Sequence, residues 1–198
     1  MPDGSIDLHK TMAPGKSRDA ETIAVGDMIG QYRIKRLLGR GGMGEVYEVE
    51  HQVLHKQYAL KFLPADFASR TNAVQRFKRE AQVMARLEHP HIIQVDDFGQ
   101  ADDGRYWLRM ELANGWDGFC SLEEYATHCG GKLEVDKLHA VFMQILDALS
   151  FAHRNGVVHR DMKPSNILIS TDQDGYPSFK ISDFGLVRMI GEQWIQSQ

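Results

Sequence analysis

Residues 32–51, YRIKRLLGRGGMGEVYEVEH, alternate apolar and polar side chains on both sides of a run of glycines. Alternation is the period of a β-strand, and glycine adopts the backbone conformations that tight turns require. The stretch therefore predicts a β-hairpin with a glycine-rich connection. Gly39, Gly41, Gly44 and Val46 form a G-x-G-x-x-G-x-V pattern, in which backbone N–H groups can donate to the phosphates of a ligand. Because a strand and not a helix follows the glycines, the pattern is not a dinucleotide-binding Rossmann turn.

The next two elements carry charged side chains at positions that we expect to be buried. Residues 57–63, QYALKFL, predict a third strand with Lys61 on one face, and residues 70–88 change to helical spacing with Glu80 on the apolar stripe. The stripe consists of Val74, Phe77, Ala81, Met84 and Leu87. A buried unpaired charge costs several kcal/mol, so an ion pair between Lys61 and Glu80 is one interpretation. The other is that Lys61 extends to solvent and Glu80 lies at the edge of the stripe.

The remaining sequence predicts two more strands, followed by helices. The strands are HPHIIQVDDFGQ and RYWLRMEL, around the turn ADDG, and the helical segments lie near 121–128 and 134–154. Short strands and loops occupy 156–185. The predicted fold is α+β, with a mobile extension at 1–29, a β-rich lobe with one helix at 30–113 and a mainly helical lobe at 114–198.

Two motifs in the second half carry oxygen donors and a cation. HRDMKPSN supplies Asp161, Lys163 and Asn166, and DFG supplies Asp183. Carboxylate and amide oxygens are the ligands that hard divalent cations prefer. Lys163 can place a positive charge beside an acceptor hydroxyl and a transferring phosphoryl group.

Taken in order, the glycine-rich loop, Lys61, Glu80, HRDMKPSN and DFG resemble the motifs of the eukaryotic-type protein kinases over about residues 30–190. Lys163 is typical of the Ser/Thr branch, and the opening hairpin is similar to that of bacterial members. The resemblance implies a protein kinase fold, in which a β-rich N-terminal lobe contains helix C at 70–88. It also implies that the mainly helical C-terminal lobe is incomplete in this chain.

The resemblance further implies transfer of the γ-phosphate of ATP, with Mg²⁺, to Ser or Thr hydroxyls of proteins. Asp161 would orient the hydroxyl and accept its proton, Lys163 would stabilise the transferring group, and Lys61, held by Glu80, would contact the α- and β-phosphates. The implied metal ligands are Asn166 and Asp183. The implied nucleotide contacts are Leu38, Gly39, Arg40, Gly41, Gly42, Met43, Gly44, Glu45, Val46, Ala59, Lys61, Met110, Glu111, Ala113 and Leu168. An internal hydrophobic column is implied at Met84, Val95, His159 and Phe184.

Three features depart from the family pattern. The linker GWDGFCS is longer than usual, which leaves the ribose contact unassigned, and seventeen positions separate Asn166 from Asp183. Only thirteen residues follow Gly185, whereas family members continue with an activation segment and several helices. Of these thirteen, only Ser197 could carry a phosphate that pairs with Arg160. We therefore expect this chain to be a truncated copy of a longer protein.

The helix at 134–154 carries an apolar stripe that a downstream helix covers in the family. Its members are Leu138, Val141, Phe142, Ile145, Leu149 and Ala152. Leaving three to five such side chains exposed forfeits about 1.5–3 kcal/mol each, or roughly 5–15 kcal/mol in total. This face therefore predicts poor stability unless a partner or a missing C-terminal part covers it.

Composition limits the partners. The net charge of −4 gives no basis for binding nucleic acid or an anionic membrane surface. No apolar run is long enough to span a bilayer, and the N-terminus lacks a signal-peptide core. Cys120 and Cys129 are too few for a disulfide framework, which indicates a reducing, cytoplasmic setting.

Two other functions compete with protein phosphorylation. A pseudokinase-like interaction module would bind ATP without transferring phosphate; the absent substrate platform favours this function, and the complete catalytic set opposes it. A small-molecule phosphotransferase of the same fold is disfavoured because HRDMKPSN has the protein-kinase form.

Overall fold

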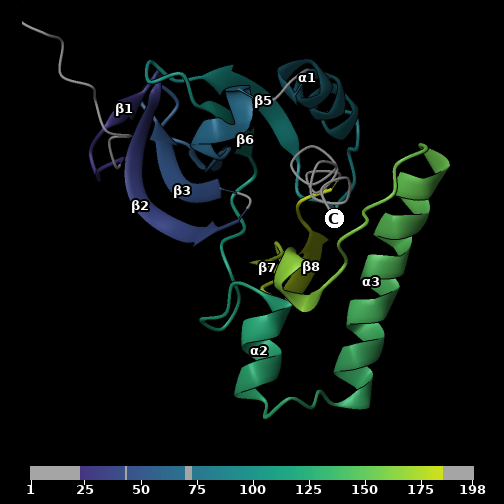
Figure 1. The fold of residues 1–198 in the computed structure, drawn as a ribbon. Helices are drawn as coiled ribbons and strands as arrows, with labels where there is room; N and C mark the ends of the chain where they lie inside the picture. The colour runs from purple at the N-terminus through teal and green to yellow at the C-terminus, as the bar shows by residue number, and fades with distance from the viewer. Residues whose placement is uncertain (1–22, 43, 70–72, 185–198) are drawn as a thin grey trace, which may run out of the picture.

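The computed structural model describes residues 23–42, 44–69 and 73–184 (Figure 1). Met43, Gly185, Ser197 and most of the predicted N-terminal extension lie outside the described residues. The N-terminal region is a six-stranded antiparallel sheet with the order β1-β2-β3-β4-β6-β5. The strands are β1 (Met28–Ile29), β2 (Tyr32–Gly41), β3 (Gly44–His51), β4 (Gln57–Phe62), β5 (Val95–Gln100) and β6 (Tyr106–Met110).

Strands β2 and β3 form the hairpin that the sequence predicted. The two strands pair as far as Arg40 opposite Glu45 and Gly41 opposite Gly44, so the ladder continues into the glycine-rich segment. Gly44 has a φ of +109°, and a Cβ at this position would lie 1.8 Å from the carbonyl oxygen of Phe62. Only glycine therefore allows β3 to begin against β4.

The helix of the N-terminal region, α1 (Ala73–Met84), follows a short 3₁₀ turn at Ala65–Ser69. The predicted helical stripe is present: Phe77, Ala81 and Met84 are buried within the helix. Leu87 is also buried, at 2% exposure, but it lies beyond the end of the helix. The predicted helix at 70–88 is thus four residues too long at its C-terminal end, and residues 70–72 lie outside the described part.

Apolar side chains cover both faces of this sheet. Ala59 and Leu108 belong to the inner cluster, which also contains Phe77 from α1. Leu60 and Phe62, which alternate with Ala59 along β4, belong to the outer cluster. The alternation in QYALKFL therefore serves two cores, one on each side of the strand.

The C-terminal region contains two helices and a two-stranded antiparallel sheet. The elements are α2 (Leu122–His128), α3 (Val135–Arg154), a 3₁₀ turn at Pro164–Asn166, β7 (Ile167–Thr171) and β8 (Pro177–Ile181). Strands β7 and β8 lie between the N-terminal sheet and the two helices (Figure 1). Both helices fall where the sequence predicted them, and none of the helices in the described ranges is long and apolar enough to cross a bilayer.

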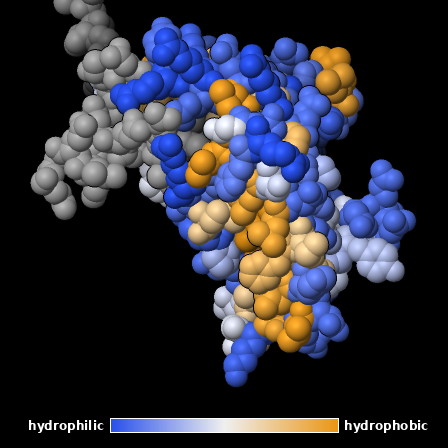
Figure 2. Space-filling model, turned by 90° about the vertical axis from the view of Figure 1, so that its right-hand side faces the viewer, coloured by the Kyte–Doolittle hydropathy of each residue, from blue (hydrophilic) through white to orange (hydrophobic). Residues whose placement is uncertain are grey.

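Helix α3 is buried on only part of its apolar surface. Val141 and Ile145 are buried, as the predicted stripe required, whereas Phe142 is 54% exposed and Leu138 is 38% exposed. Met143, Leu146 and Val135 add to the exposed apolar surface. Figure 2 shows hydrophobic residues running along this side of the molecule. Packing against β8 therefore covers one edge of the stripe and leaves the other in contact with solvent.

Candidate active site

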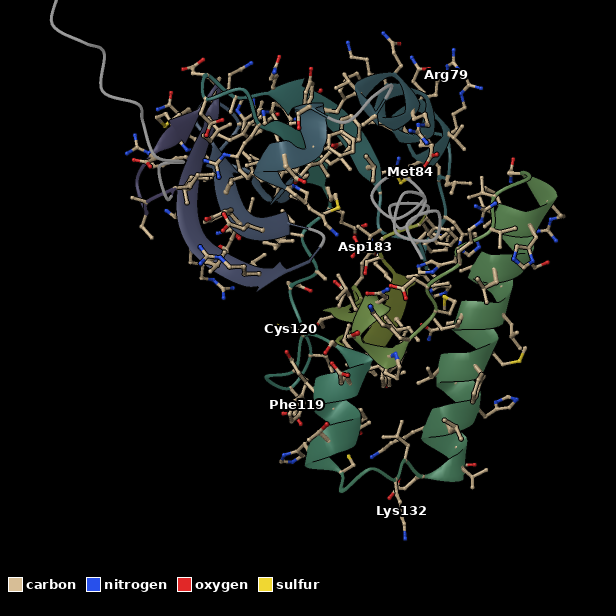
Figure 3. All side chains as sticks on the ribbon, in the orientation of Figure 1. Arg79, Met84, Phe119, Cys120, Lys132 and Asp183 are labelled. Atoms are coloured by element: carbon tan, nitrogen blue, oxygen red, sulfur yellow. The ribbon has the colours of Figure 1, made fainter. Side chains whose placement is uncertain are left out.

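The two regions of the molecule meet at a buried ion pair. Lys61 on β4 is 3% exposed, and its Nζ lies 2.7 Å from Oδ1 of Asp183, which follows β8. Asp183 lies between the N-terminal sheet and the β7–β8 sheet (Figure 3). The side chain of Asp183 is 19% exposed, so both charges are largely removed from water and stabilise each other.

The predicted ion pair between Lys61 and Glu80 does not form between these two described residues. Lys61 bonds Asp183, and the Glu80 side chain instead lines a pocket with Val158 and Arg160 of the segment that follows α3. The physical reason is placement: Asp183 lies within bonding distance of the Lys61 ammonium, whereas Glu80 faces the segment that follows α3. The prediction that Lys61 is buried and paired holds, but the partner is different.

His159 fixes the backbone around the HRDMKPSN motif. Its side chain is buried, its Nε2 donates to the carbonyl oxygen of Ser182 at 2.7 Å, and its Nδ1 accepts from the Asp161 N–H at 3.2 Å. Burial lowers the pKa of His159 below its ordinary value of 6.5, so the ring is neutral near pH 7 and keeps both bonds. The ring of Phe184 packs edge-on at 4.7 Å. His159 therefore ties the Asp161 backbone to the segment between β8 and Asp183.

Asp161 is held by a cation and an amide. Its Oδ2 accepts from Nζ of Lys163 at 2.9 Å and from Nδ2 of Asn166 at 3.0 Å. These bonds, with that from Lys163 the strongest, hold the pKa of Asp161 below its ordinary value. The carboxylate is therefore ionised at neutral pH and can act as a proton acceptor.

Two residues of this site have positive backbone φ values. Arg160 has a φ of +69° and Asp183 a φ of +62°, in the left-handed region that residues other than glycine rarely adopt. Such conformations persist where the surrounding contacts enforce them, and they concentrate at functional sites. Here the enforcing contacts are the His159–Ser182 bond and the Lys61–Asp183 ion pair.

The predicted metal ligands offer the donor atoms that Mg²⁺ prefers. Asn166 is buried, and its Nδ2 donates hydrogen bonds to Asp161. Its Oδ1 is the side-chain atom that could ligate a metal ion. Asp183 brings a carboxylate. One amide oxygen just before β7 and one carboxylate just after β8 fit a hard cation that completes its shell with phosphate oxygens and water.

Four of the predicted nucleotide contacts lie in or against the inner apolar cluster. Ala59 and Met110 are buried in it, and Val46 and Leu168 pack against it while half-buried. Ala59 pairs with Met110 across β4 and β6, so the two side chains are neighbours. The four residues come from four different strands, and the fold brings them to one core.

Behind Met110 lies a small apolar cavity. It is lined by Met84 from α1, by Val95 from β5 and by Phe184, together with Asp183. Three residues of the predicted hydrophobic column therefore share one cavity wall, and the fourth, His159, contacts Phe184. The column runs from α1 to the HRDMKPSN segment.

Contacts that anchor the linker between the regions were missed by the sequence analysis. The Glu111 carboxylate pairs with Lys180 on β8 at 2.7 Å, and Asn114 Oδ1 accepts from the Ser170 hydroxyl at 2.7 Å and from the Thr171 N–H. These contacts tie the linker to β7 and β8. The polar residues in ELANG were the only signal for them.

The profile of the protein kinase domain matches residues 32–197. The chain therefore belongs to the protein kinase family, with the antiparallel sheet, helix α1 and the Asp161 and Asp183 segments in the order that its motifs predicted.

Among its relatives are Ser/Thr protein kinases of bacteria. The chain is 43% identical over 168 residues to PknH of Mycobacterium tuberculosis and 38% identical over 166 residues to PrkC of Bacillus subtilis. These alignments cover 85% and 84% of this chain but 25% and 24% of the relatives. The chain thus spans about a quarter of the length of the curated relatives that it matches.

The crystal structure of the Mycobacterium tuberculosis PknI kinase domain has the same fold. It superposes with a TM-score of 0.69 at 33% sequence identity, covering 83% of this chain and 64% of the PknI chain. The predicted kinase-like α+β fold is confirmed.

Proposed function

We propose that this chain carries the nucleotide and catalytic groups of a kinase that transfers the γ-phosphate of ATP to Ser or Thr hydroxyls of proteins. The observation that carries the proposal is the ion pair between Lys61, which lies opposite Val46 of the hairpin strand β3, and Asp183. His159 links the segment of Asp183 to that of an ionised Asp161. The named relatives, which are Ser/Thr protein kinases, support it.

In this proposal Asp161 and Lys163 act on the acceptor. The Asp161 carboxylate accepts the hydroxyl proton as the hydroxyl oxygen bonds to the γ-phosphorus, and the bond from that phosphorus to the β–γ bridging oxygen breaks. Lys163, now 2.9 Å from Asp161, supplies positive charge to the transferring group.

The other charged groups hold the nucleotide. Lys61 donates to the α- and β-phosphates, and the N–H groups of the glycine-rich segment cover them. Asn166 and Asp183 would hold Mg²⁺, which neutralises charge on the phosphates when it is bound. Lys61 and Asp183 are bonded to each other at 2.7 Å, so this bond would have to open for Lys61 to reach the phosphates and for Asp183 to reach Mg²⁺.

Transfer of radiolabel from [γ-³²P]ATP to a Ser/Thr protein substrate tests the proposal. We expect wild-type transfer, with Asp161→Asn reducing it by about 10²- to 10⁴-fold, since the general base is removed. The mutant should still bind Mg²⁺–ATP in a thermal-shift assay. Equal transfer by the wild type and Asp161→Asn contradicts the role of Asp161.

One observation favours a second function, nucleotide binding without transfer. Lys61 bonds Asp183, and the Lys61–Glu80 pair that the kinase motifs imply does not form between these two described residues. In that case ATP would shift the melting temperature, but the wild type would transfer no more label than Asp161→Asn. The same two assays therefore separate the two functions.

We also propose a cytoplasmic setting. ATP is available there, and both cysteines of the chain are free and exposed, as thiols are in a reducing compartment. Alkylation of Cys120 and Cys129 in intact cells, followed by mass spectrometry, tests the setting; a disulfide between chains would contradict it.

A further inference from the structure

Three of the described glycines in the glycine-rich hairpin are surrounded by open space. A Cβ added at Gly39, Gly41 or Gly42 would meet no atom within 4 Å. Gly44 packs closely on the Phe62 backbone, but the open space at the other three glycines provides no van der Waals contact to restrain them. Polar contacts nearby can therefore contribute to the position of the hairpin.

Glu45, the second residue of β3, makes such contacts with the facing strand. It lies opposite Arg40 in the ladder, and its Oε1 is 2.7 Å from Nε of Arg40. Cross-strand pairs of opposite charge stabilise a hairpin at the point where they occur. This pair lies at the last ladder position before the Gly41–Gly44 closure.

The same carboxylate connects the hairpin to a second segment. Its Oε2 accepts a hydrogen bond from the hydroxyl of Tyr47 at 2.8 Å. The same oxygen lies 3.9 Å from Nη1 of Arg105, in the turn between β5 and β6. Arg105 is in turn bonded to Asp103 of that turn, and its guanidinium lies over the ring of Phe62 at 5.3 Å. Glu45 thus links the hairpin to a turn that is anchored on the sheet.

These contacts lie on the face of the sheet that looks away from the nucleotide groups. Tyr47 is buried in the outer cluster with Phe62, whereas Val46, one residue earlier, packs on the inner cluster. By strand alternation Glu45 shares the outer side with Tyr47. Its side chain therefore acts on a ligand only through the position of the hairpin.

We propose that Glu45 is a positioning residue for nucleotide binding, which ties the glycine-rich hairpin to Arg105 and so sets how closely the hairpin covers the phosphates. The inference rests on the proposed function. The side chains of Glu45 and Arg105 are only 22% and 13% exposed, so solvent screens their attraction less than it screens a surface pair.

Titration of the chain with fluorescent mant-ATP and Mg²⁺ tests the inference. Glu45→Gln keeps the size of the side chain and an acceptor for Tyr47 but removes the charge, and we expect Kd to rise about threefold or more. Glu45→Asp, which keeps the charge, should recover part of the affinity. In the transfer assay Glu45→Gln should raise KM for ATP and leave kcat within about twofold.

Glu50→Gln is the matched control. Glu50 lies near the other end of the same strand, pairs with Lys35 and His55, and makes no contact with the glycine-rich segment. We expect this variant to bind mant-ATP as the wild type does. A similar rise in Kd for Glu50→Gln would assign the effect to the strand in general and overturn the role of Glu45.

A double-mutant cycle identifies the partner. Arg105→Gln should raise Kd in the same direction, and Glu45→Gln combined with Arg105→Gln should raise it by less than the product of the single effects, because both remove one contact. If the wild type binds mant-ATP and both single variants bind equally well, the inference is wrong and the proposed function stands. A wild type that binds no nucleotide contradicts the proposed function, and the inference with it.

Discussion

The N-terminal sheet and helix α3 bury their apolar residues to different extents. Phe77 in α1 is fully buried against the sheet, whereas Phe142 in α3 is 54% exposed, although both lie on an apolar helical stripe. Yet the charged groups of the candidate site come from both regions and meet, as Lys61 and Asp183 show. How completely a helix is packed and whether the charged residues of the candidate site meet are therefore separate properties of this chain.

The largest expected effect is on the free energy of unfolding, and it distinguishes Phe77 from Phe142. Phe77→Ala should lower the free energy of unfolding by about 3–5 kcal/mol, because it opens a cavity in a filled core. Phe142→Ala should change it by less than about 0.5 kcal/mol, as substitutions at exposed positions do. Chemical denaturation measures both; equal losses would show that α3 is packed more completely than its exposure indicates.

The second prediction concerns the ion pair that joins the regions. Lys61→Met removes a charge-assisted contact to the phosphates and leaves Asp183 without its cation, so the Kd for mant-ATP should rise about tenfold or more. Lys35→Met is the control, since Lys35 forms an exposed pair with Glu50 on β2 and β3. If Lys61→Met binds mant-ATP with unchanged Kd, the Lys61–Asp183 ion pair is not part of the nucleotide site.

The third prediction concerns the exposed face of α3. Replacing Phe142 and Leu146 with Gln should reduce the binding of a hydrophobic dye and the light scattering of concentrated solutions, because both are large apolar side chains that are more than half exposed. Stability should change by less than about 1 kcal/mol. Ile145→Gln, at a buried position of the same helix, should instead destabilise the fold.

The smallest expected effect is a pH dependence at the junction. His91 donates through Nδ1 to the carbonyl oxygen of Phe179, and burial lowers its pKa below 6.5. Its unfolded form therefore binds the proton more readily, so stability is highest above pH 6.5 and falls as the pH drops through the lowered pKa.

Denaturation at pH 7.5 and pH 5 measures this contribution. His91→Gln should reduce the loss of stability between the two pH values, whereas His55→Gln should leave it unchanged because the His55 side chain is 77% exposed. An identical pH dependence in the wild type and His91→Gln would exclude His91 as its source.

Local patterns predicted most of the fold. The hairpin at 32–51, the helices near 121–128 and 134–154 and the buried stripe with Phe77 follow from periods of two and 3.6 residues, which depend only on neighbours in the chain. The end of α1 at Met84 was missed because Leu87 continues the apolar pattern but is buried by tertiary contacts beyond the helix.

For the candidate site, the sequence indicated which side chains are buried but not which of them pair. Burial of Lys61 follows from its place in QYALKF, but the choice between Glu80 and Asp183 as its partner depends on how α1 and the end of β8 are placed in space. The link from Glu45 to Arg105 could not be predicted either, because it joins segments sixty residues apart through a turn.

The sequence by itself determined the kinase family, the strands and helices, and the set of polar residues from Lys61 to Asp183, because each motif is encoded by residues close together in the chain. The tertiary structure alone decided that Lys61 bonds Asp183, that Glu45 links the hairpin to Arg105 and that part of α3 stays exposed. The physical reason is that ion pairs and burial depend on distances between segments, and only the packed chain sets those distances.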